Sequence, residues 1–165
     1  MKRIGLLSDT HGFFDPLIAD YFSACDEIWH AGDIGSADVA SRLADIATLR
    51  AVNGNIDGTE IRKRFPERQR FYCEQVSVLM THIGGYPGRY ARGVRESLLA
   101  EPPRLFVCGH SHILKVMHDK RLGHLCLNPG AAGRQGIHKV RTLLRFVIEG
   151  QAIKDMEVIE MGPRA

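Results

Sequence analysis

Residues 3–12 read R-I-G-L-L-S-D-T-H-G, a short apolar run that ends in an aspartate, a histidine and a glycine. Such a run is typical of a buried strand followed by a turn. The pattern recurs at 27–33, E-I-W-H-A-G-D, and again at 49–55, L-R-A-V-N-G-N. Between these runs, residues 16–24 and 36–46 have the apolar spacing of helices. This β-α-β-α-β order predicts a parallel α/β core.

The second half of the chain has a different pattern. A helix is expected at 90–100, where Pro102 and Pro103 follow, and a strand at 105–108. Three strand pairs with turn residues between them predict hairpins at 70–81, 115–128 and 141–160. We therefore expect residues 1–165 to form a single α/β domain with two packed sheets flanked by helices.

Composition is ordinary for a globular protein. Of the 165 residues, 44% are apolar and 25% charged, and the net charge is +3. This charge is too small by itself to indicate a nucleic-acid partner. Basic residues gather in I-R-K-R-F-P-E-R-Q-R at 61–70. We interpret that run as a solvated loop or helix face, with attraction of a polyanionic substrate as the alternative.

The cysteines and the apolar runs indicate the compartment. The four cysteines form no C-x-x-C pair, and three of them lie in apolar, strand-like runs, so we expect reduced thiols. The apolar run after M-K-R is too short for a signal peptide, and no 18-residue apolar run occurs. These features predict a cytoplasmic protein with no membrane partner.

Side chains that can bind metal follow five of the predicted strands. In open α/β sheets, ligands bind outside the carboxyl ends of the strands. Each motif is weak alone, but the joint pattern predicts one polar cluster. The candidate ligands are Asp9, His11, Asp33, Asn55, His82, His110 and His112.

Seven ligands are too many for one structural zinc ion, and they suit two divalent ions that share a bridging carboxylate. Imidazole, carboxylate and amide donors favour Mn, Fe, Zn, Co or Ni, with manganese as the first choice. Two ions bring +4, Asp9 and Asp33 bring −2, and a bridging hydroxide leaves about +1. Such a centre attracts phosphate and supplies a nucleophile near neutral pH. The cluster therefore predicts hydrolysis of phosphate esters by a metal-bridging hydroxide.

The order of these motifs resembles the calcineurin-like metallophosphoesterase superfamily. The motifs are D-x-H at 9–11, G-D at 32–33, G-N at 54–55, His82 and G-H-x-H at 109–112. The chain length and L-N-P-G at 127–130 resemble the small single-domain branch of YfcE-like phosphodiesterases. The resemblance implies a four-layer α/β/β/α sandwich of two mixed sheets.

The resemblance also implies roles for the candidate ligands. It places Asp33 as the bridge between the two ions, Asn55 on the second ion and on the substrate phosphate, and Asp33, Asn55 and His82 as the catalytic residues. One ion would take Asp9, His11, Asp33 and His112, and the other Asp33, Asn55, His82 and His110. Arg134, after N-P-G, is a candidate phosphate contact.

Several positions depart from the family pattern or lie outside it. Where many members have G-N-H, this chain has Ile56, which cannot protonate a leaving group, so substrates with good leaving groups are expected. We interpret Asp57 as a turn residue and His30 as a neighbour of the ligands. The remaining histidines are expected at the surface: His118, His124 and His138.

The ligand set favours a two-metal phosphodiesterase, with some monoesterase activity as an open alternative. A protein-binding scaffold on the same fold is the second hypothesis, because a sorting-complex subunit shows that this branch can serve in that way. A nuclease is the third, with nucleic acid as substrate only. Related small members often self-associate, so the oligomeric state stays open.

Overall fold

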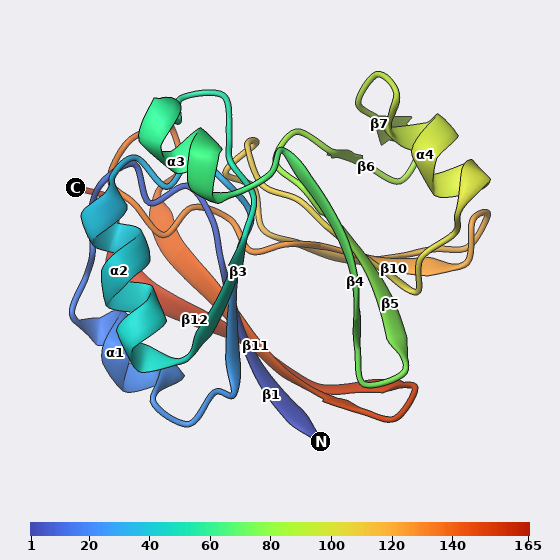
Figure 1. The fold of residues 1–165 in the computed structure, drawn as a ribbon, viewed down its shortest axis with the longest axis horizontal. Coiled ribbons are helices and arrows are strands. Elements are labelled where there is room, and N and C mark those ends of the chain that lie inside the picture. Colours follow the sequence, from blue (N-terminus) through green and yellow to red (C-terminus); the bar gives the residue numbers. More distant parts are fainter.

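Two five-stranded sheets pack against each other in the computed structural model, which describes residues 1–165 (Figure 1). The first sheet has the order β12-β11-β1-β2-β3. Its strands are β1 (Lys2–Leu7), β2 (Glu27–His30), β3 (Thr48–Ala51), β11 (Val140–Glu149) and β12 (Ala152–Pro163). Strands β1, β2 and β3 are parallel, and β11 and β12 are antiparallel to their neighbours. The predicted parallel core is therefore confirmed.

The second sheet has the order β4-β5-β8-β10-β9. Its strands are β4 (Arg68–Cys73), β5 (Val76–Thr81), β8 (Leu105–Val107), β9 (Lys115–Asp119) and β10 (His124–Asn128). The predicted hairpins form as β4–β5, β9–β10 and β11–β12. At the centre of this sheet, β5, β8 and β10 are parallel. A small ribbon, β6 (Gly85–Tyr86) with β7 (Arg89–Tyr90), follows β5.

The helices are α1 (Leu17–Phe22), α2 (Ala37–Ile46), α3 (Thr59–Arg64) and α4 (Val94–Ala100). Ser36 caps α2, and its side chain accepts a hydrogen bond from the Val39 N–H. Helix α4 begins at Val94, later than predicted. Gly93 has φ +81°, which is not a helical conformation, so the helix cannot extend back to residue 90. Helix α3 was not predicted as a separate element, since only Ile61 of its residues is buried.

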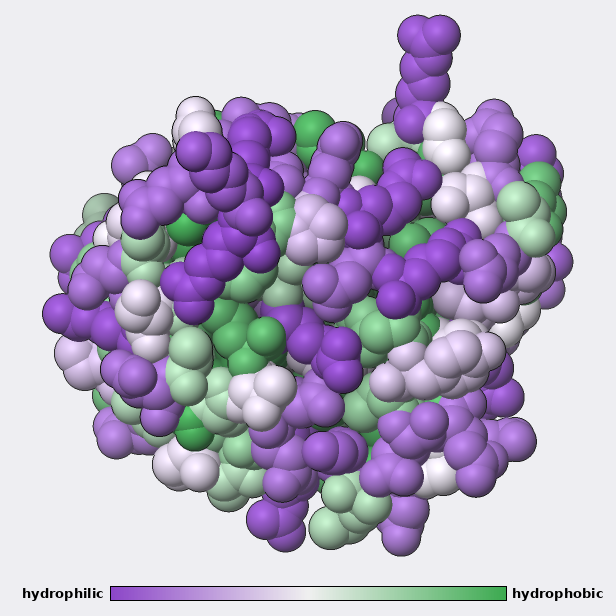
Figure 2. Space-filling view, in the orientation of Figure 1, coloured by the Kyte–Doolittle hydropathy of each residue, from purple (hydrophilic) through white to green (hydrophobic).

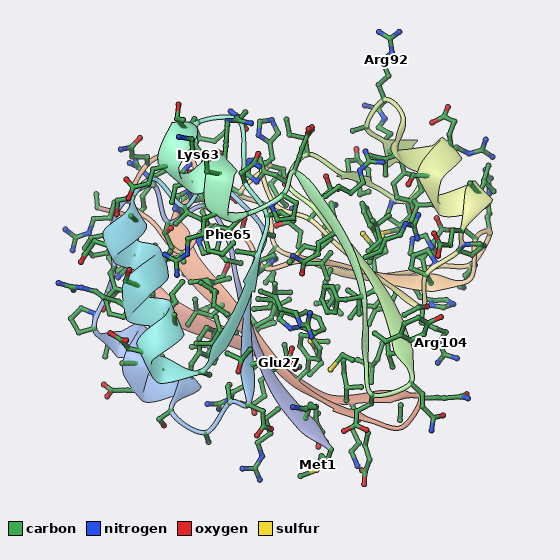
Figure 3. All side chains as sticks on the ribbon, in the orientation of Figure 1. Met1, Glu27, Lys63, Phe65, Arg92 and Arg104 are labelled. Atoms are coloured by element: carbon green, nitrogen blue, oxygen red, sulfur yellow. The ribbon has the colours of Figure 1, made fainter.

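Three apolar clusters separate four layers. Strand residues alternate between them: Ile4 and Leu6 of β1 face the second sheet, whereas Leu7 faces α1 and α2. On β8, Leu105 and Val107 face the first sheet, whereas Phe106 faces α4. Side chains fill the space between the sheets (Figure 3). The predicted α/β/β/α sandwich of two mixed sheets flanked by helices is confirmed.

The prediction that His124 lies at the surface is wrong. His124 is only 1% exposed and packs against Phe106 beneath β7. Its Nε2 lies 2.9 Å from the Tyr90 hydroxyl, and that hydroxyl also bonds Asp119. The three polar groups satisfy one another, which allows the imidazole to be buried. His118 on β9 is exposed as predicted.

The carboxyl ends of β1, β2, β3, β5 and β8 gather at one edge of the two sheets, drawn uppermost in Figure 1. The loops that leave these strands face one another there. In the same view, the molecular face is largely hydrophilic with scattered apolar patches (Figure 2). All four cysteines are buried and unpaired. No helix is long and apolar enough to cross a membrane.

Candidate metal centre

Six of the candidate ligands form two adjoining clusters. Asp9, His11 and His112 make the first cluster, and Asp33, His82 and His110 make the second. Within each cluster one ligand atom from every residue lies within 4.8 Å of the others. The structure thus places His110 and His112, only two residues apart, in different clusters.

Two carboxylate oxygens lie where the clusters meet. Asp33 Oδ2 is 3.1 Å from His82 Nε2 and 3.6 Å from His11 Nε2, so it faces both clusters. Asp9 Oδ1 is 3.2 Å from His112 Nε2. It is also 3.8 Å from the Nε2 atoms of His11 and His82. Each cluster could hold a cation, with these carboxylate oxygens between the two positions.

The other oxygen of each carboxylate is held by the protein. Asp9 Oδ2 accepts from the Ser8 hydroxyl at 2.6 Å and from the His110 N–H at 3.1 Å. Asp33 Oδ1 accepts from the Ile56 N–H at 3.0 Å. These bonds fix both carboxylates and leave the oxygens that face the clusters free to bind a cation.

Backbone conformation also singles out this site. Only seven non-glycine residues of the chain have positive φ. Five of them are candidate ligands: Asp9, His11, Asp33, His110 and His112. Left-handed backbone costs a non-glycine residue about 1–3 kcal/mol and tends to occur at functional sites. The fold therefore tolerates strain at these positions, whose side chains make up most of the two clusters.

Close packing of the backbone brings the clusters together. A Cβ on Gly54 would collide with the Asp33 carboxylate and backbone nitrogen. A Cβ on Gly109 would collide with the Ser8 hydroxyl and lie 2.9 Å from Asp9 Oδ2. These glycines of the G-N and G-H motifs allow the loops after β3 and β8 to contact the carboxylates directly.

Three buried atoms in the centre have no hydrogen-bond partner: Asp9 Oδ1, His11 Nε2 and His82 Nε2. Buried polar atoms are normally paired, because leaving one unpaired costs about 1–3 kcal/mol. His82 Nδ1 lies 2.7 Å from the Ala31 carbonyl oxygen, so Nδ1 carries the proton and Nε2 has a free lone pair. Oxygen and imidazole nitrogen donors fit divalent transition metals.

The pKa values show how strongly these groups interact. Burial alone would raise the pKa of Asp9, but the His11 and His112 imidazoles outweigh it and hold that pKa well below its usual range. Asp9 raises the pKa of His11. Burial lowers the pKa of His82, yet Asp33 and Asp9 outweigh burial and raise it overall. Two carboxylates thus create a negative potential that attracts cations.

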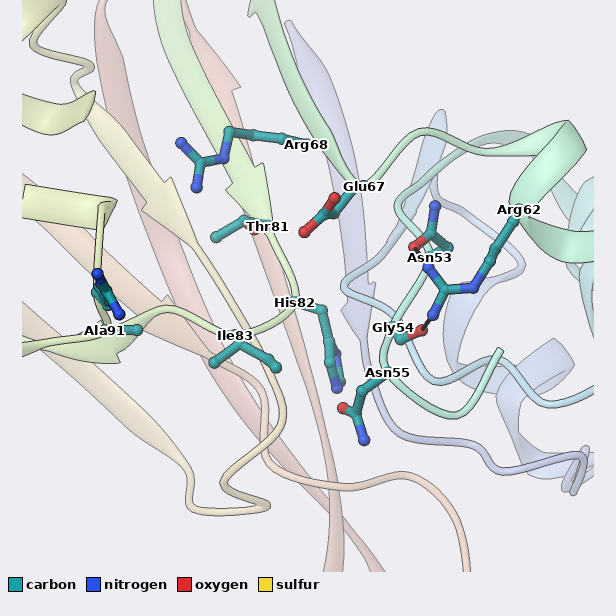
Figure 4. A pocket seen from close by; sticks show the side chains of 11 residues that line it. Asn53, Gly54, Asn55, Arg62, Glu67, Arg68, Thr81, His82, Ile83 and Ala91 are labelled. Carbon is teal, nitrogen blue, oxygen red and sulfur yellow. Dashed lines mark hydrogen bonds between the residues drawn. The ribbon is translucent and has the colours of Figure 1, made fainter. Parts of the chain in front are cut away.

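Asn55, the seventh candidate ligand, lies at the rim of the centre. Its side chain is beside the His82 imidazole in a cleft of about 390 Å³ (Figure 4). Arg62 holds the loop that carries it, donating to the carbonyls of Asp57 and Gly54 at 2.7 and 2.8 Å. The basic run at 61–70 is therefore only partly a solvated face, because this arginine braces the Asn55 loop.

Asp57 ties two loops together. Its carboxylate accepts from the N–H groups of Gly35 and Gly54, both at 2.8 Å, and so joins the Asp33 loop to the Asn55 loop. It is thus more than a local turn residue. Ile56 is 46% exposed and offers no proton donor. The Arg134 guanidinium lies over the Phe13 ring, 4.2 Å from its centroid.

Two histidines support the loops of the centre. Burial lowers the pKa of His30 to about 4. The neutral ring accepts from the Gly32 N–H at 3.1 Å and lies 3.0 Å from the Thr10 hydroxyl. His138, expected at the surface, is half-buried, and its Nδ1 is 3.2 Å from His112 Nδ1. The N-P-G motif at 128–130 marks a sixth strand end at this edge. It could have indicated that the loop carrying His138 lies near the centre.

Residues 1–151 match the sequence model of the calcineurin-like phosphoesterase superfamily domain. A probable metallophosphoesterase from Methanothermobacter thermautotrophicus is 30% identical over 169 aligned positions, which cover 96% of this chain and 92% of that protein. A probable metallophosphoesterase from Methanocaldococcus jannaschii is 28% identical over 137 positions, which cover 78% of this chain and 67% of that protein.

Solved structures share the fold. An archaeal phosphodiesterase superposes with a TM-score of 0.74 at 18% identity, covering 96% of this chain and 99% of that one. Vps29 from Entamoeba histolytica, complexed with Zn²⁺, superposes with a TM-score of 0.74 at 15% identity, covering 96% and 98%. At such identities the likeness shows the fold alone.

Proposed function

This chain belongs to the calcineurin-like phosphoesterase superfamily, and on that premise we propose that it hydrolyses phosphodiester bonds with two divalent metal ions. The observation that carries the proposal is the pair of clusters that meet at Asp9 and Asp33. Three buried donor atoms there have no partner within the protein. A chain without need of metal would be expected to pair or lose such groups.

The two clusters divide the proposed ligands. One ion would be held by Asp9, His11, Asp33 and His112, and the other by Asp33, Asn55, His82 and His110. When bound, two such ions lower the pKa of water and neutralise charge on the phosphoryl oxygens. We assign Asp33 as the bridging ligand because its Oδ2 faces both His11 and His82. Manganese is our first choice of metal.

Two clefts adjoin the centre, and this favours a diester. The α3-side cleft is the 390 Å³ space beside His82 and Asn55. The β6-side cleft is a space of about 190 Å³ beside His110, where Lys115 Nζ lies 4.4 Å from the Tyr86 ring centroid. Ile83 and Ala91 border both clefts. A phosphate at the centre would therefore have space for one substituent in each cleft.

Charge in the clefts favours anionic substituents. Three arginines and one glutamate line the α3-side cleft: Arg62, Arg68, Arg92 and Glu67. The Arg62 guanidinium is already bonded to loop oxygens, and Arg92 extends away into solvent (Figure 3). Arg68 is the remaining arginine of this cleft, and we propose that it contacts a substituent. Arg134 remains our candidate for an outer phosphate contact, since it follows the sixth strand end.

The missing proton donor at Ile56 sets the choice of leaving group. Asn55 can contact the phosphate but cannot protonate the departing oxygen. We therefore expect faster turnover of aryl diesters than of alkyl diesters, because an aryl oxide leaves without a proton.

The test is hydrolysis of bis-p-nitrophenyl phosphate by purified protein with added manganese. We expect turnover by the natural chain and a loss of at least about 100-fold in Asp33→Asn, which removes one bridging charge with little change of shape. Asp38→Asn, an exposed aspartate on α2, is the matched control and should keep full activity.

A protein-binding scaffold is the competing function. It would be supported if metal-loaded protein showed no turnover of phosphodiesters or monoesters. Activity on nucleic acid alone would instead support the nuclease alternative.

A further inference from the structure

His138 lies in the loop between β10 and β11 and contacts a proposed metal ligand. Its Nδ1 is 3.2 Å from His112 Nδ1, and the two rings meet edge to face with centroids 5.0 Å apart. Its Nε2 is 2.9 Å from the Gly133 carbonyl oxygen. His138 therefore bridges its own loop and the ring that faces Asp9.

These two contacts determine which nitrogen carries each proton. A carbonyl oxygen can only accept, so the Nε2 of His138 is the donor toward Gly133. A neutral His138 then has a lone pair on Nδ1, which can accept only from a protonated Nδ1 of His112. This leaves the lone pair of His112 on Nε2, the atom that lies 3.2 Å from Asp9 Oδ1 and faces the centre.

The loop holds His138 in this place. A Cβ on Gly136 would collide with His112 Nδ1, so the backbone passes directly over that ring. Arg164 anchors the other side, since its Nε donates to the His138 carbonyl at 3.0 Å and its N–H donates to the Lys139 carbonyl at 3.0 Å. The contact with His112 is thus built by two segments distant in sequence.

We propose that His138 is a positioning residue that fixes the Nδ1–H form of His112 and so directs the His112 Nε2 lone pair at the metal. This inference rests on the proposed function, in which His112 is a ligand. Hydrogen bonding to the second nitrogen of a metal-bound imidazole sets its proton position and ring orientation. Here a second imidazole supplies that bond, where carboxylates or carbonyls are usual.

The test compares two substitutions. His138→Asn retains an acceptor near the position of Nδ1, whereas His138→Leu has similar size and no acceptor. Ile137→Ala, a change at the neighbouring and 95% exposed residue, is the control for general effects on the loop. Two readouts are needed: the tautomer of His112 from ¹⁵N–¹H correlations in metal-free protein, and the affinities for Zn²⁺ from competition with a chelator.

We expect His112 to be the Nδ1–H tautomer in the natural chain and in His138→Asn, and to shift toward the Nε2–H tautomer in His138→Leu. We expect His138→Leu to weaken one of two Zn²⁺ affinities by about 10- to 100-fold, and Ile137→Ala to change neither. If His138→Leu does not fold, His138→Ala is measured in its place.

An unchanged tautomer, or unchanged Zn²⁺ affinities, in the acceptor-free variant would overturn the inference. Failure of the proposed function looks different. In that case the natural chain binds no metal or turns over no ester, while the tautomer measurement on metal-free protein still decides the role of His138.

Discussion

Left-handed backbone at the candidate ligands is the clearest sign of function at the scale of single residues. His110 has φ +70°, in a region that suits glycine far better than a residue with a Cβ. The imidazole is retained there despite the strain, and it is exposed. This combination is expected where geometry serves a site and stability does not require the residue.

We predict that His110→Gly is more stable than His110→Ala by about 1 kcal/mol, because both lose the imidazole but only glycine relieves the strain. Urea unfolding of metal-free protein measures the difference. At His118, exposed on regular strand β9, the order should be reversed, since glycine weakens a strand. Equal stability of the two His110 variants would show that the backbone there is unstrained.

The sequence was informative about the candidate ligands at the strand ends. It was less informative about the residues that hold those ligands and their loops in place. The order of motifs was enough to select seven side chains, six of which the fold brings into two clusters. His138 and Asp57 could not be given their roles, because their partners lie in other loops and no local pattern shows the contact. His124 was misplaced for the same reason: its burial depends on Tyr90 and Asp119.

At the scale of elements, one ion pair joins the start of α1 to β11. Arg141 Nη1 donates to Asp15 Oδ2 at 2.6 Å, and both residues are less than 10% exposed. Asp15 Oδ1 also accepts a hydrogen bond from the Leu17 N–H at 2.9 Å, so its carboxylate contacts the first residue of α1 as well as Arg141. The pair therefore orients the helix that follows the Asp9 and His11 loop.

We predict that Asp15→Asn lowers the free energy of unfolding by about 3 kcal/mol at pH 7, because it leaves a buried guanidinium unpaired. Burial raises the pKa of Asp15, but Leu17 and Arg141 outweigh it and lower that pKa overall. A carboxylate whose pKa is lower in the folded protein stabilises the fold at pH values above its pKa in the unfolded chain. This stabilisation is lost as the pH falls through its pKa in the folded protein.

The difference in the free energy of unfolding between the natural chain and Asp15→Asn should therefore be largest above about pH 4 and become smaller below it. Denaturant unfolding over a pH series measures this gap. Asp20→Asn, at an exposed aspartate of α1 without an ion pair, should change little at any pH. A gap that does not depend on pH would contradict the role of the Asp15 charge.

Elements with strong local signals were predictable, and those without were not. The helix at α2 and the hairpins carry clear periodicity and turn residues, and all of them form. Helix α3 buries one residue, and the ribbon β6–β7 has two residues on each strand, so neither has a periodic pattern to detect. Strand β8 lies between β5 and β10 because it pairs with strands distant in sequence, and no local pattern specifies such pairing.

At the scale of the molecule, two sheets contribute to one centre. The first sheet supplies Asp9, His11 and Asp33, and the second supplies His82, His110 and His112. Each cluster contains side chains from both sheets, so packing of the sheets against the shared apolar core sets the geometry of the site. The resemblance to a known family predicted this architecture, and the composition alone could not have done so.

We expect one centre to hold two ions, with His110 on one and His112 on the other. Anomalous diffraction from crystals soaked in manganese measures this directly. We predict two peaks in the natural chain, loss of the peak beside His82 in His110→Ala, and loss of the peak beside His11 in His112→Ala. A single peak in the natural chain, or loss of the same peak in both variants, would contradict a centre in which each of these histidines binds a different ion.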